Sequence, residues 1–441
     1  MGRHTVTGML SAAGSQFVDW SAAYRVFSKE RFNAQDVMDR VLGGVVECLP
    51  QQEPLVVALD SSLLRKKGMR THGVRYLRDP LGPPFHVNLV RAQRVLQMSA
   101  ALPAGDGRAR MIPVDFVLDH SPRKPRKNAP LERWREYREQ YKRSNICSMA
   151  SGRLEMLRQR MDGQGHQREM IAVGDGGFTN GRMMKKLPGR MTFIGRLRAD
   201  AKLYRLPEQN NAPARGRRRI YGAPLPTPEQ IRRDESIPWQ TVRIHAAGKW
   251  HDFRFKTLSP LRWRATGDAH DLRLVVIAPL GYRIRKGAPI AFRKPAYLIC
   301  TDPDLPLDRL IQSYIWRWDI EVNFRDEKTL LGVGQAQVRT PSSVEGVPQL
   351  IVAAYATLLL AAKRAFAIAN DKLSLPKPKW RAKRKKPRTT TSDLIQQMRA
   401  EMWGKALGID NFSDFATQPK HDTKYDKIKP DLASAVLYAC A

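Results

Sequence analysis

The sequence predicts an α/β fold with one mixed β-sheet, and three observations lead to this prediction. LVVALD, from Leu55 to Asp60, and MIAVGD, from Met170 to Asp175, are short apolar runs with the composition of buried strands. The stretch from Leu131 to Met161 is rich in arginine and glutamate and is predicted to be helical. Strands and helices therefore alternate along the chain, which is typical of α/β domains.

The remaining elements follow in chain order. Residues 1–54 place aromatic residues and valines at near-helical spacing, so this segment is predicted to be helical. Residues 55–120 contain further strand-like runs, and the SPRKPRKNAP that follows is a turn-rich basic linker. Between Trp239 and Cys300, β-favouring segments such as TVRIHAA and PAYLIC alternate with turn residues, which predicts a β-rich insertion.

Two further helices are predicted after this insertion. The apolar run from Leu350 to Ala362 is shorter than the roughly 20 residues that span a membrane, so it is interpreted as a buried core helix. Nearer the C-terminus, Thr391 or Ser392 precedes DLIQQMRAEMW in the position of a helix cap. No signal peptide is visible at the N-terminus.

The net charge indicates a polyanionic partner. The chain carries a formal charge of +34 with a pI near 10.4, and DNA is the simplest partner for such a protein. Basic residues concentrate at 123–127, at 215–219 and above all at 372–388. The last stretch is predicted to be a DNA-clamping arm, although a solvated charged segment is the alternative. Its expected DNA contacts are Lys383, Arg384, Lys385 and Lys386.

Cysteines and histidines give no metal-binding pattern. The four cysteines form no CxxC pair, and a reduced, cytosolic setting is the default expectation. The nine histidines contain no HExxH pair, so zinc-dependent hydrolysis has little support from the sequence.

A stripe of polar residues marks the segment YIWRWDIEVNFRDEK. Counted from Tyr314, the offsets of Arg317, Glu321 and Lys328 are 3, 7 and 14 (317 − 314, 321 − 314, 328 − 314). At about 100° per residue these side chains share one narrow face of a helix. Apolar residues lie beside that face and are expected to anchor the helix on a core: Trp316, Ile320, Phe324 and Leu331.

This stripe also has a structural interpretation. Arg317 and Glu321 are four residues apart and would form an ion pair on any exposed helix. Asp326 and Glu327 point away from the stripe by the same helical count and are expected to be solvated.

Two other acids favour a functional site. Asp60 and Asp175 each end a buried strand, where a carboxylate is costly unless a positive group or hydrogen-bond donors meet it. Together with Glu321 they form an oxygen ligand set suited to Mg²⁺ or Mn²⁺. Two such ions would support in-line attack on a phosphodiester. Asp115 and Asp119 are alternative acids near a strand end.

At this point the sequence resembles the bacterial insertion-sequence transposases that carry a DDE triad and a Y-R-E-K signature. The signature is a tyrosine, two residues, an arginine, three residues, a glutamate, six residues and a lysine. Tyr314, Arg317, Glu321 and Lys328 match every spacing, and LLGVGQAQVR at 330–339 resembles the continuation. The resemblance implies an RNase H-like mixed sheet flanked by helices and interrupted by the β-rich insertion, with helical N- and C-terminal segments.

The resemblance also implies the roles of the site residues. Asp60, Asp175 and Glu321 would be the catalytic, metal-binding triad for two Mg²⁺ ions, with Mn²⁺ able to substitute. Arg317 and Lys328 would hold DNA phosphates at the cleaved end, and Tyr314 would orient that end. Arg325, on the same helix, is a further expected DNA contact.

The implied activity is DNA cleavage at the ends of a mobile element and transfer of the freed strand to target DNA by a cut-and-paste route. The resemblance also implies a homodimer in a synaptic complex and a cytoplasmic, nucleoid-associated location in a bacterium. The alternative is an inactive or domesticated relative that binds DNA and regulates. The expected divisions are a helical segment at 1–54 that contacts the DNA end, catalytic core at 55–200, the β-rich insertion at 201–305, the glutamate-bearing part of the core at 306–370, and the basic arm with a helical segment at 371–441.

The sequence leaves two smaller features open. GDGG at 174–177 is either a phosphate cradle or a tight turn. Trp239, Trp250 and Trp263 in the insertion are either a base-stacking surface or core residues.

Overall fold

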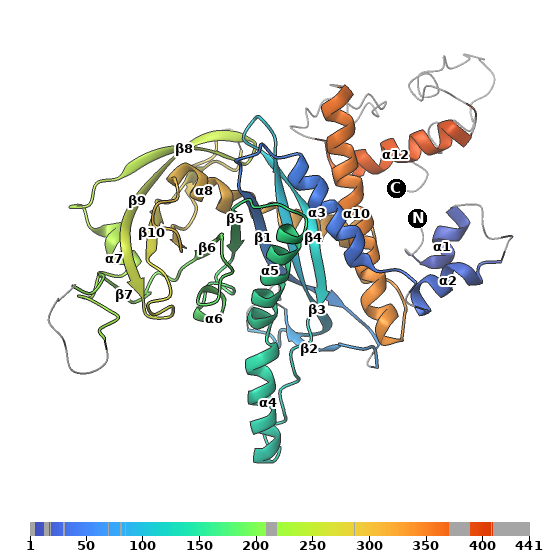
Figure 1. Cartoon of the computed structure of the whole chain (residues 1–441), viewed down its shortest axis with the longest axis horizontal. Coiled ribbons are helices and arrows are strands. Elements are labelled where there is room, and N and C mark those ends of the chain that lie inside the picture. The colour runs from blue at the N-terminus through green and yellow to red at the C-terminus, as the bar shows by residue number, and fades with distance from the viewer. Residues whose placement is uncertain are drawn as a thin grey trace.

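A large mixed sheet organises the molecule (Figure 1). The computed structural model describes residues 5–12, 17, 19–29, 31–68, 70–79, 82–83, 85–208, 218–285, 287–369, 389–406 and 408. Within them, an 11-stranded sheet has the order β2-β3-β1-β5-β6-β13-β10-β9-β7, with β4 paired to β3 and β8 paired to β9. The α/β prediction is confirmed.

The central strands carry the two sequence runs that predicted them. β1 (Leu55–Arg65) pairs antiparallel with β3 (Leu89–Pro103) and parallel with β5 (Met170–Gly174), which pairs parallel with β6 (Met191–Arg196). The other strands are β2 (Arg75–Arg78), β4 (Ala109–Leu118), β7 (Leu203–Tyr204), β8 (Gln240–Ala246), β9 (Lys249–Trp263), β10 (Leu272–Ile277) and β13 (Ala296–Cys300), and β11 (Gly281–Tyr282) and β12 (Ala291–Phe292) form a separate ribbon.

The sheet is covered by an apolar layer on each face. Successive residues of a strand point to opposite faces, and in β1 the side chains of Leu55, Val57 and Leu59 join one core cluster. Val56 and Ala58, between them, join the other. The strand is therefore buried on both sides up to Asp60.

Helices flank the sheet. α3 (Ala34–Glu47) and the long α10 (Pro341–Ala369) pack against each other and against β4, at the end of the molecule opposite β8–β10 (Figure 1). The other helices are α1 (Val6–Ala12), α2 (Ser21–Ser28), α4 (Leu131–Ser144), α5 (Ile146–Gly163), α6 (Gly181–Met184), α7 (Pro228–Arg233), α8 (Leu307–Trp316), α9 (Asp319–Thr329) and α12 (Thr391–Ala406).

α10 contains the apolar run that was interpreted as a core helix. Its segment Pro341–Ala365 is long and apolar enough to cross a membrane, yet half of the most apolar window is buried inside the protein. Val352, Ala353 and Ala356 are among its fully buried residues.

The predicted helices needed two corrections. The helix from Leu131 to Met161 is two helices, because the side chain of Asn145 accepts hydrogen bonds from the N–H groups of Cys147 and Ser148 and caps α5. α12 begins with Thr390 rather than Thr391 or Ser392 in the capping role, since Thr390 and Asp393 exchange side-chain to backbone hydrogen bonds.

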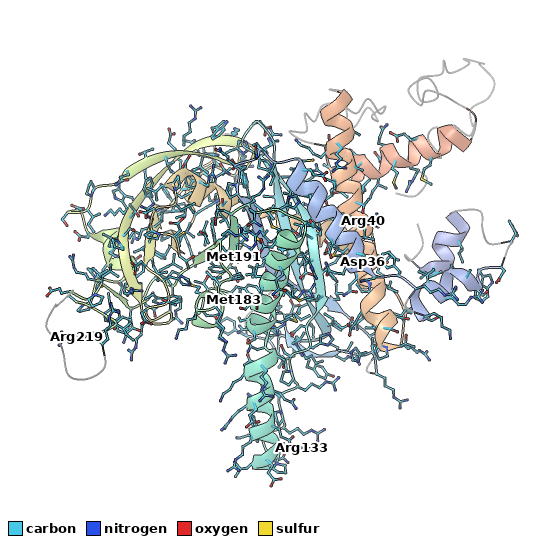
Figure 2. The ribbon with its side chains drawn as sticks, in the orientation of Figure 1. Asp36, Arg40, Arg133, Met183, Met191 and Arg219 are labelled. Carbon is cyan, nitrogen blue, oxygen red and sulfur yellow. The ribbon has the colours of Figure 1, made fainter. Side chains whose placement is uncertain are left out.

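α4 has no buried residue and extends away from the sheet. Figure 2 shows Arg133 near its outer end. α4 is followed by α5, whose Leu154 and Leu157 are fully buried against the sheet. The basic, exposed α4 is therefore held in place at one end by the core.

Candidate active site

The parallel pairing of β1 and β5 brings Asp60 and Asp175 to the same edge of the sheet. Ala58 lies opposite Val173, and each aspartate follows two residues later (60 − 58 = 2 and 175 − 173 = 2). The carboxyl ends of parallel strands are where α/β sheets place ligands. The prediction that Asp60 ends its strand is wrong, because β1 continues to Arg65, whereas Asp175 directly follows the last residue of β5. Both side chains are half-buried.

The turn after β5 is organised around Asp175. Its carboxylate accepts hydrogen bonds from the N–H groups of Gly177 at 2.8 Å and Phe178 at 3.3 Å, and its carbonyl accepts one from the hydroxyl of Thr179. The GDGG segment is therefore a tight turn whose amides are directed at its own aspartate. The turn fixes the orientation of Asp175.

Glu321 lies on α9, and the helix predicted from Tyr314 to Lys328 is broken. α8 ends at Trp316 and α9 begins at Asp319. Between them, the N–H groups of Trp318, Ile320 and Glu321 bond to the carbonyl oxygens three residues earlier, so the chain tightens into a 3₁₀-like turn while Arg317 keeps a helical backbone.

The apolar face next to the stripe packs as predicted. Ile320 and Phe324 are buried, Trp316 and Leu331 pack partly buried against the core, and the indole N–H of Trp316 donates to the carbonyl of Gly107. These contacts anchor α8 and α9 on the sheet and place the stripe next to β1.

The guanidinium group of Arg317 lies between two of the three acids. It is 3.5 Å from the carboxylate of Asp60 and 3.5 Å from that of Glu321, and its side chain is only 10% exposed. The same group lies 5.6 Å from the ring centre of Tyr314. The buried positive charge of Arg317 therefore bridges β1, which carries Asp60, and α9, which carries Glu321.

The acids interact electrostatically. Burial raises the pKa of Asp60 to about 6, and repulsion from Asp175 and Glu321 adds to this, while the N–H of Ser61 and the charge of Arg317 oppose it. Burial likewise raises the pKa of Glu321, with Arg317 opposing and Asp175 contributing. Asp60, Asp175 and Glu321 therefore share one electrostatic field, although they come from three distant parts of the chain.

Tyr314 and Lys328, the remaining residues of the stripe, also lie near the three acids. Burial raises the pKa of Tyr314, against the charges of Arg317 and Arg196. Lys328 donates a hydrogen bond of 2.5 Å to the hydroxyl of Ser62, two residues after Asp60 on β1. Arg325 is exposed and donates to Asp326. The expected contacts Lys383, Arg384, Lys385 and Lys386 lie outside the described residues.

The prediction that Asp326 and Glu327 are solvated is wrong. Asp326 is 5% exposed and accepts a hydrogen bond from Thr391 of α12, and Glu327 is 1% exposed. The helical count places Asp326 opposite the stripe, and α12 covers α9 on that side. The same count places Glu327 close to Ile320, on the side of the helix that packs on the sheet. Burial raises the pKa of Glu327 to about 8, against the opposing effects of Gln97 and Lys328.

The alternative acids have partners of their own. Asp115 forms a bidentate ion pair with Arg153, and Asp119 pairs with Arg75 and Arg94. Both carboxylates are buried in these ion pairs. They stabilise the fold around β4 and are not directed at the three acids.

The tryptophans of the β-rich region differ in exposure. Trp239 and Trp263 pack partly buried against the core, whereas Trp250 is 49% exposed and lies beside Arg243. Trp250 alone of the three keeps an exposed ring.

Two basic residues near the site were missed by sequence reasoning. Arg196 ends β6, where Gly195 lies opposite Gly174, so it stands next to the Asp175 strand end. Lys66, just after β1, donates to the carbonyl of Gly334, and burial lowers its pKa. Arg196 is the last residue of β6 and Lys66 directly follows β1, so the position of each at the end of a strand was the signal that the sequence offered.

Comparison with known proteins identifies the family of the chain. A family model described as DDE superfamily endonuclease matches residues 1–257, a range that contains Asp60 and Asp175 and ends before Glu321. No curated protein matches the chain. Because the match spans more than half of the sequence and the fold is a mixed sheet flanked by helices, the chain belongs to the DDE superfamily endonuclease family.

Proposed function

We propose that this endonuclease is a DNA transposase that cuts at the ends of a mobile element and joins the freed 3′ hydroxyl to target DNA by a cut-and-paste route. The observation that carries the proposal is the meeting of Asp60, Asp175 and Glu321 in one electrostatic field, beside the carboxyl end of β5 and the middle of β1. The spaced Tyr314, Arg317 and Lys328 beside them supply groups that can hold a DNA end.

The three acids suit divalent cations. Carboxylate oxygens are the ligands that Mg²⁺ and Mn²⁺ prefer. Burial raises the pKa values of Asp60 and Glu321, and a bound cation would stabilise the ionised form of both groups. Asp60, Asp175 and Glu321 would hold two Mg²⁺ ions, which supply a nucleophile and stabilise the leaving oxygen during in-line attack. Mn²⁺ would substitute.

The protein's own residues position the DNA. Arg317 neutralises Asp60 and Glu321 in the DNA-free protein, and its guanidinium would turn to a phosphate once cations occupy the acids. Lys328, held by Ser62, is a second phosphate contact, and Tyr314 orients the cleaved end. Arg325 extends this surface outward.

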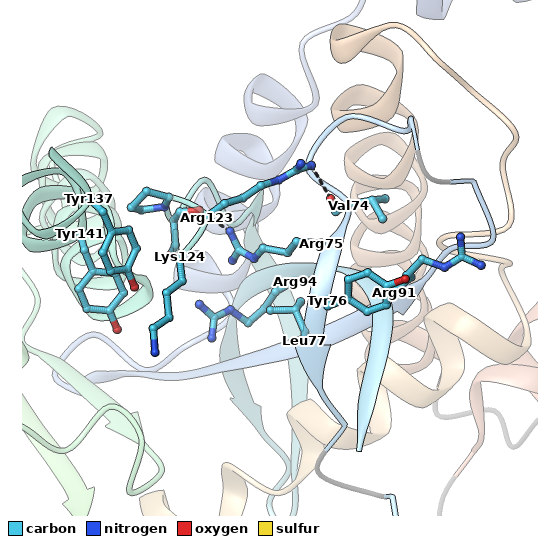
Figure 3. A pocket seen from close by; sticks show the side chains of 12 residues that line it. Val74, Arg75, Tyr76, Leu77, Arg91, Arg94, Arg123, Lys124, Tyr137 and Tyr141 are labelled. Atoms are coloured by element: carbon cyan, nitrogen blue, oxygen red, sulfur yellow. Dashed lines mark hydrogen bonds between the residues drawn. The ribbon is translucent and has the colours of Figure 1, made fainter. Parts of the chain in front are cut away.

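A basic cavity of about 480 Å³ offers a further DNA-binding surface (Figure 3). It lies between α4 and the strands β2 and β3. Its lining combines positive groups with tyrosine rings that can stack on bases, among them Arg91, Arg94, Arg123, Lys124, Tyr137 and Tyr141. The rings of Tyr137 and Tyr141 lie 5.5 Å apart. This pairing of charge and aromatic rings favours nucleic acid over a protein partner.

Removing charge from this cavity should weaken DNA binding in a salt-dependent way. In the double variant Arg91→Ala/Lys124→Ala, the slope of log K against log salt should fall by about two, since about one counterion is released per phosphate contact. Arg283→Ala/Arg285→Ala, at two exposed arginines outside the cavity, is the matched control. Fluorescence anisotropy with a labelled duplex measures the slope, and equal slopes in all three proteins would remove the cavity from the DNA-binding surface.

The remaining expectations complete the proposal. Two copies of the chain would synapse two element ends, residues 1–54 would contact the DNA end, and the basic arm within 371–441 would clamp DNA. Residues 55–200 and 306–370 would form the catalytic core, and the β-rich region at 201–305 would shape the active site. A nucleoid-associated location in a bacterial cell goes with this activity.

Cleavage of a labelled duplex tests the proposed function. The duplex carries the inverted repeats that flank the gene, and it is incubated with wild-type protein in Mg²⁺, in Mn²⁺ or in chelator, together with a target plasmid. We expect metal-dependent nicking at the repeat boundary and joining to the plasmid by wild type, with neither in Asp60→Asn. Binding of the repeat without cleavage under any metal condition would make the protein a DNA-binding regulator instead.

A further inference from the structure

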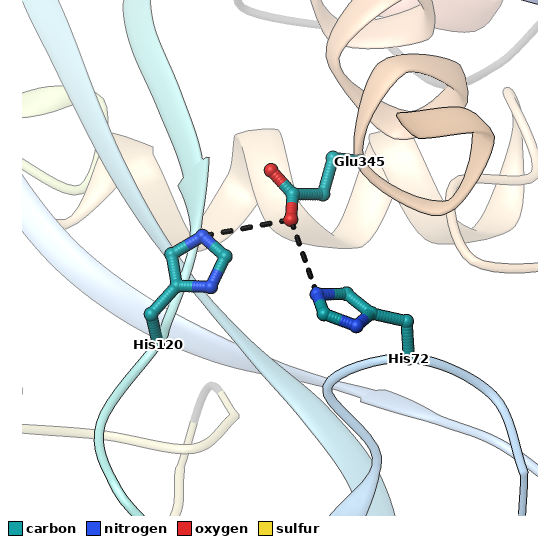
Figure 4. A group of neighbouring side chains, drawn as sticks. All are labelled: His72, His120 and Glu345. Atoms are coloured by element: carbon teal, nitrogen blue, oxygen red, sulfur yellow. Dashed lines mark ion pairs between the residues drawn. The ribbon is translucent and has the colours of Figure 1, made fainter. Parts of the chain in front are cut away.

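Two histidines and a glutamate from three distant segments meet at the surface (Figure 4). His72 lies in the loop after β1, His120 follows β4, and Glu345 lies on α10. Their ligand atoms all lie within 4.8 Å of one another. None of them takes part in the proposed DNA chemistry.

The spacing of these atoms fits a tetrahedral metal site. The Nε2 atoms of His72 and His120 lie 3.4 Å and 3.6 Å from the same oxygen, Oε1 of Glu345. Ligands about 2.0–2.1 Å from a zinc ion in tetrahedral geometry stand roughly 3.3–3.4 Å apart. Both histidine-to-glutamate distances therefore lie close to the edge length of a zinc tetrahedron, and both exceed those of ordinary hydrogen bonds.

The backbone of each histidine is held by a buried polar side chain. The amide of Gln93, which is 1% exposed, donates a hydrogen bond of 2.6 Å to the carbonyl of His72. His120 directly follows Asp119, whose carboxylate is fixed by Arg75 and Arg94. The donors thus need little ordering to bind a cation, which lowers the entropic cost of binding.

The third ligand stands on a rigid helix. Glu345 lies between Val344 and Val347, which are buried and hold this turn of α10 on the core. The three ligand side chains are 40%, 53% and 31% exposed, so an ion can reach them from solvent. A fixed carboxylate and two fixed imidazoles therefore surround an accessible point.

We propose that His72, His120 and Glu345 form a transition-metal site that binds Zn²⁺ and is separate from the carboxylate site for Mg²⁺. Imidazole nitrogen suits Zn²⁺, whereas Mg²⁺ prefers oxygen ligands, so the two sites select different ions. With three protein ligands, the fourth position of the tetrahedron stays open to water or to a phosphate oxygen.

The site connects the loop after β1 to α10. Val74 and Ser121, two residues after His72 and one after His120, line the basic cavity, and Arg123 donates to the carbonyl of Val74. Zinc would therefore fasten one wall of the cavity to the long helix. The bound ion would order the loop at 70–74 and add a positive charge beside the DNA-binding surface.

Zinc titration of the full-length protein tests the site. Protein stripped with chelator is titrated with Zn²⁺ by calorimetry in a Glu321→Gln background, so that binding at the carboxylate site is reduced. We expect one zinc per chain, with affinity at least tenfold weaker in His120→Ala and in Glu345→Gln. His86→Ala, at another exposed histidine, is the matched control and should bind like the parent.

A second readout separates loss of the site from loss of the fold. Hydrogen exchange at residues 70–74 should slow when Zn²⁺ is added to the parent and to His86→Ala, and stay unchanged in His72→Gln, a change in an exposed side chain. Equal zinc affinity in the parent, His120→Ala and Glu345→Gln would overturn the proposal. So would an excess of Mg²⁺ that displaces the ion at millimolar concentration.

Discussion

Replacing Glu321 by glutamine is expected to lower DNA cleavage by about 10³-fold or more and to leave DNA binding within about threefold of wild type. A carboxylate that holds a catalytic cation accounts for several kcal/mol of transition-state stabilisation, and each 1.36 kcal/mol is a factor of ten in rate. Affinity is supplied mainly by phosphate contacts, which this change leaves in place. Single-turnover cleavage and anisotropy measure the two effects separately.

Glu327→Gln is the matched control for this prediction. Glu327 lies on the same helix, α9, and receives the same change of charge, but its side chain is buried beside Gln97 rather than facing Asp60. Cleavage by Glu327→Gln should stay near the wild-type rate under conditions where the protein is folded. If Glu321→Gln cleaves as fast as Glu327→Gln, Glu321 does not hold the catalytic cations.

Glu327→Gln should itself change how stability depends on pH. Burial raises the pKa of Glu327 from its ordinary value of 4.5 to about 8 in the folded protein, so the native state binds the additional proton between these values. The free energy of unfolding of wild type therefore falls as pH rises through this window, by about 1.4 kcal/mol per pH unit from this group. Glutamine keeps the shape and stays neutral, so the variant lacks this decline.

Denaturant unfolding at pH 5 and pH 8.5 measures the difference between the two proteins. We expect Glu327→Gln to match wild type at pH 5 and to be more stable at pH 8.5 by about 2 kcal/mol or more. Asp60, whose pKa is also raised, titrates in both proteins and cancels in the comparison. A constant stability difference across the pH range would mean that Glu327 does not titrate in this window.

Local patterns were sufficient for the elements that hold the three acids. An apolar run followed by an acid predicts a buried strand with a carboxylate on it, which is how Asp60 and Asp175 were found, although β1 continues beyond Asp60. Periodicity placed Ile320 and Phe324 on the buried face next to the stripe of Arg317 and Glu321. The buried strands and the packed face of the helix depend on residues that are close in sequence, so the strand and helix periodicity of the sequence predicts them.

Local patterns failed where a second layer covers an element. Helical counting placed Asp326 opposite the stripe, but it could not reveal that α12 covers that side of α9. The 3₁₀-like turn at Arg317 was missed for a related reason, because nothing in the sequence marks it. A helix period describes one helix, whereas burial is a property of everything packed around it.

The sequence by itself determined the α/β fold class, the basic charge that favours DNA, and which carboxylates follow the apolar part of a central strand. Only the tertiary structure decided that Arg317 bridges Asp60 and Glu321, that Asp326 is buried, and that His72, His120 and Glu345 meet. No sequence motif predicts that His72, His120 and Glu345 meet, because these residues lie in three distant segments. Such contacts arise from the pairing of strands and the packing of α10, and those depend on the whole chain.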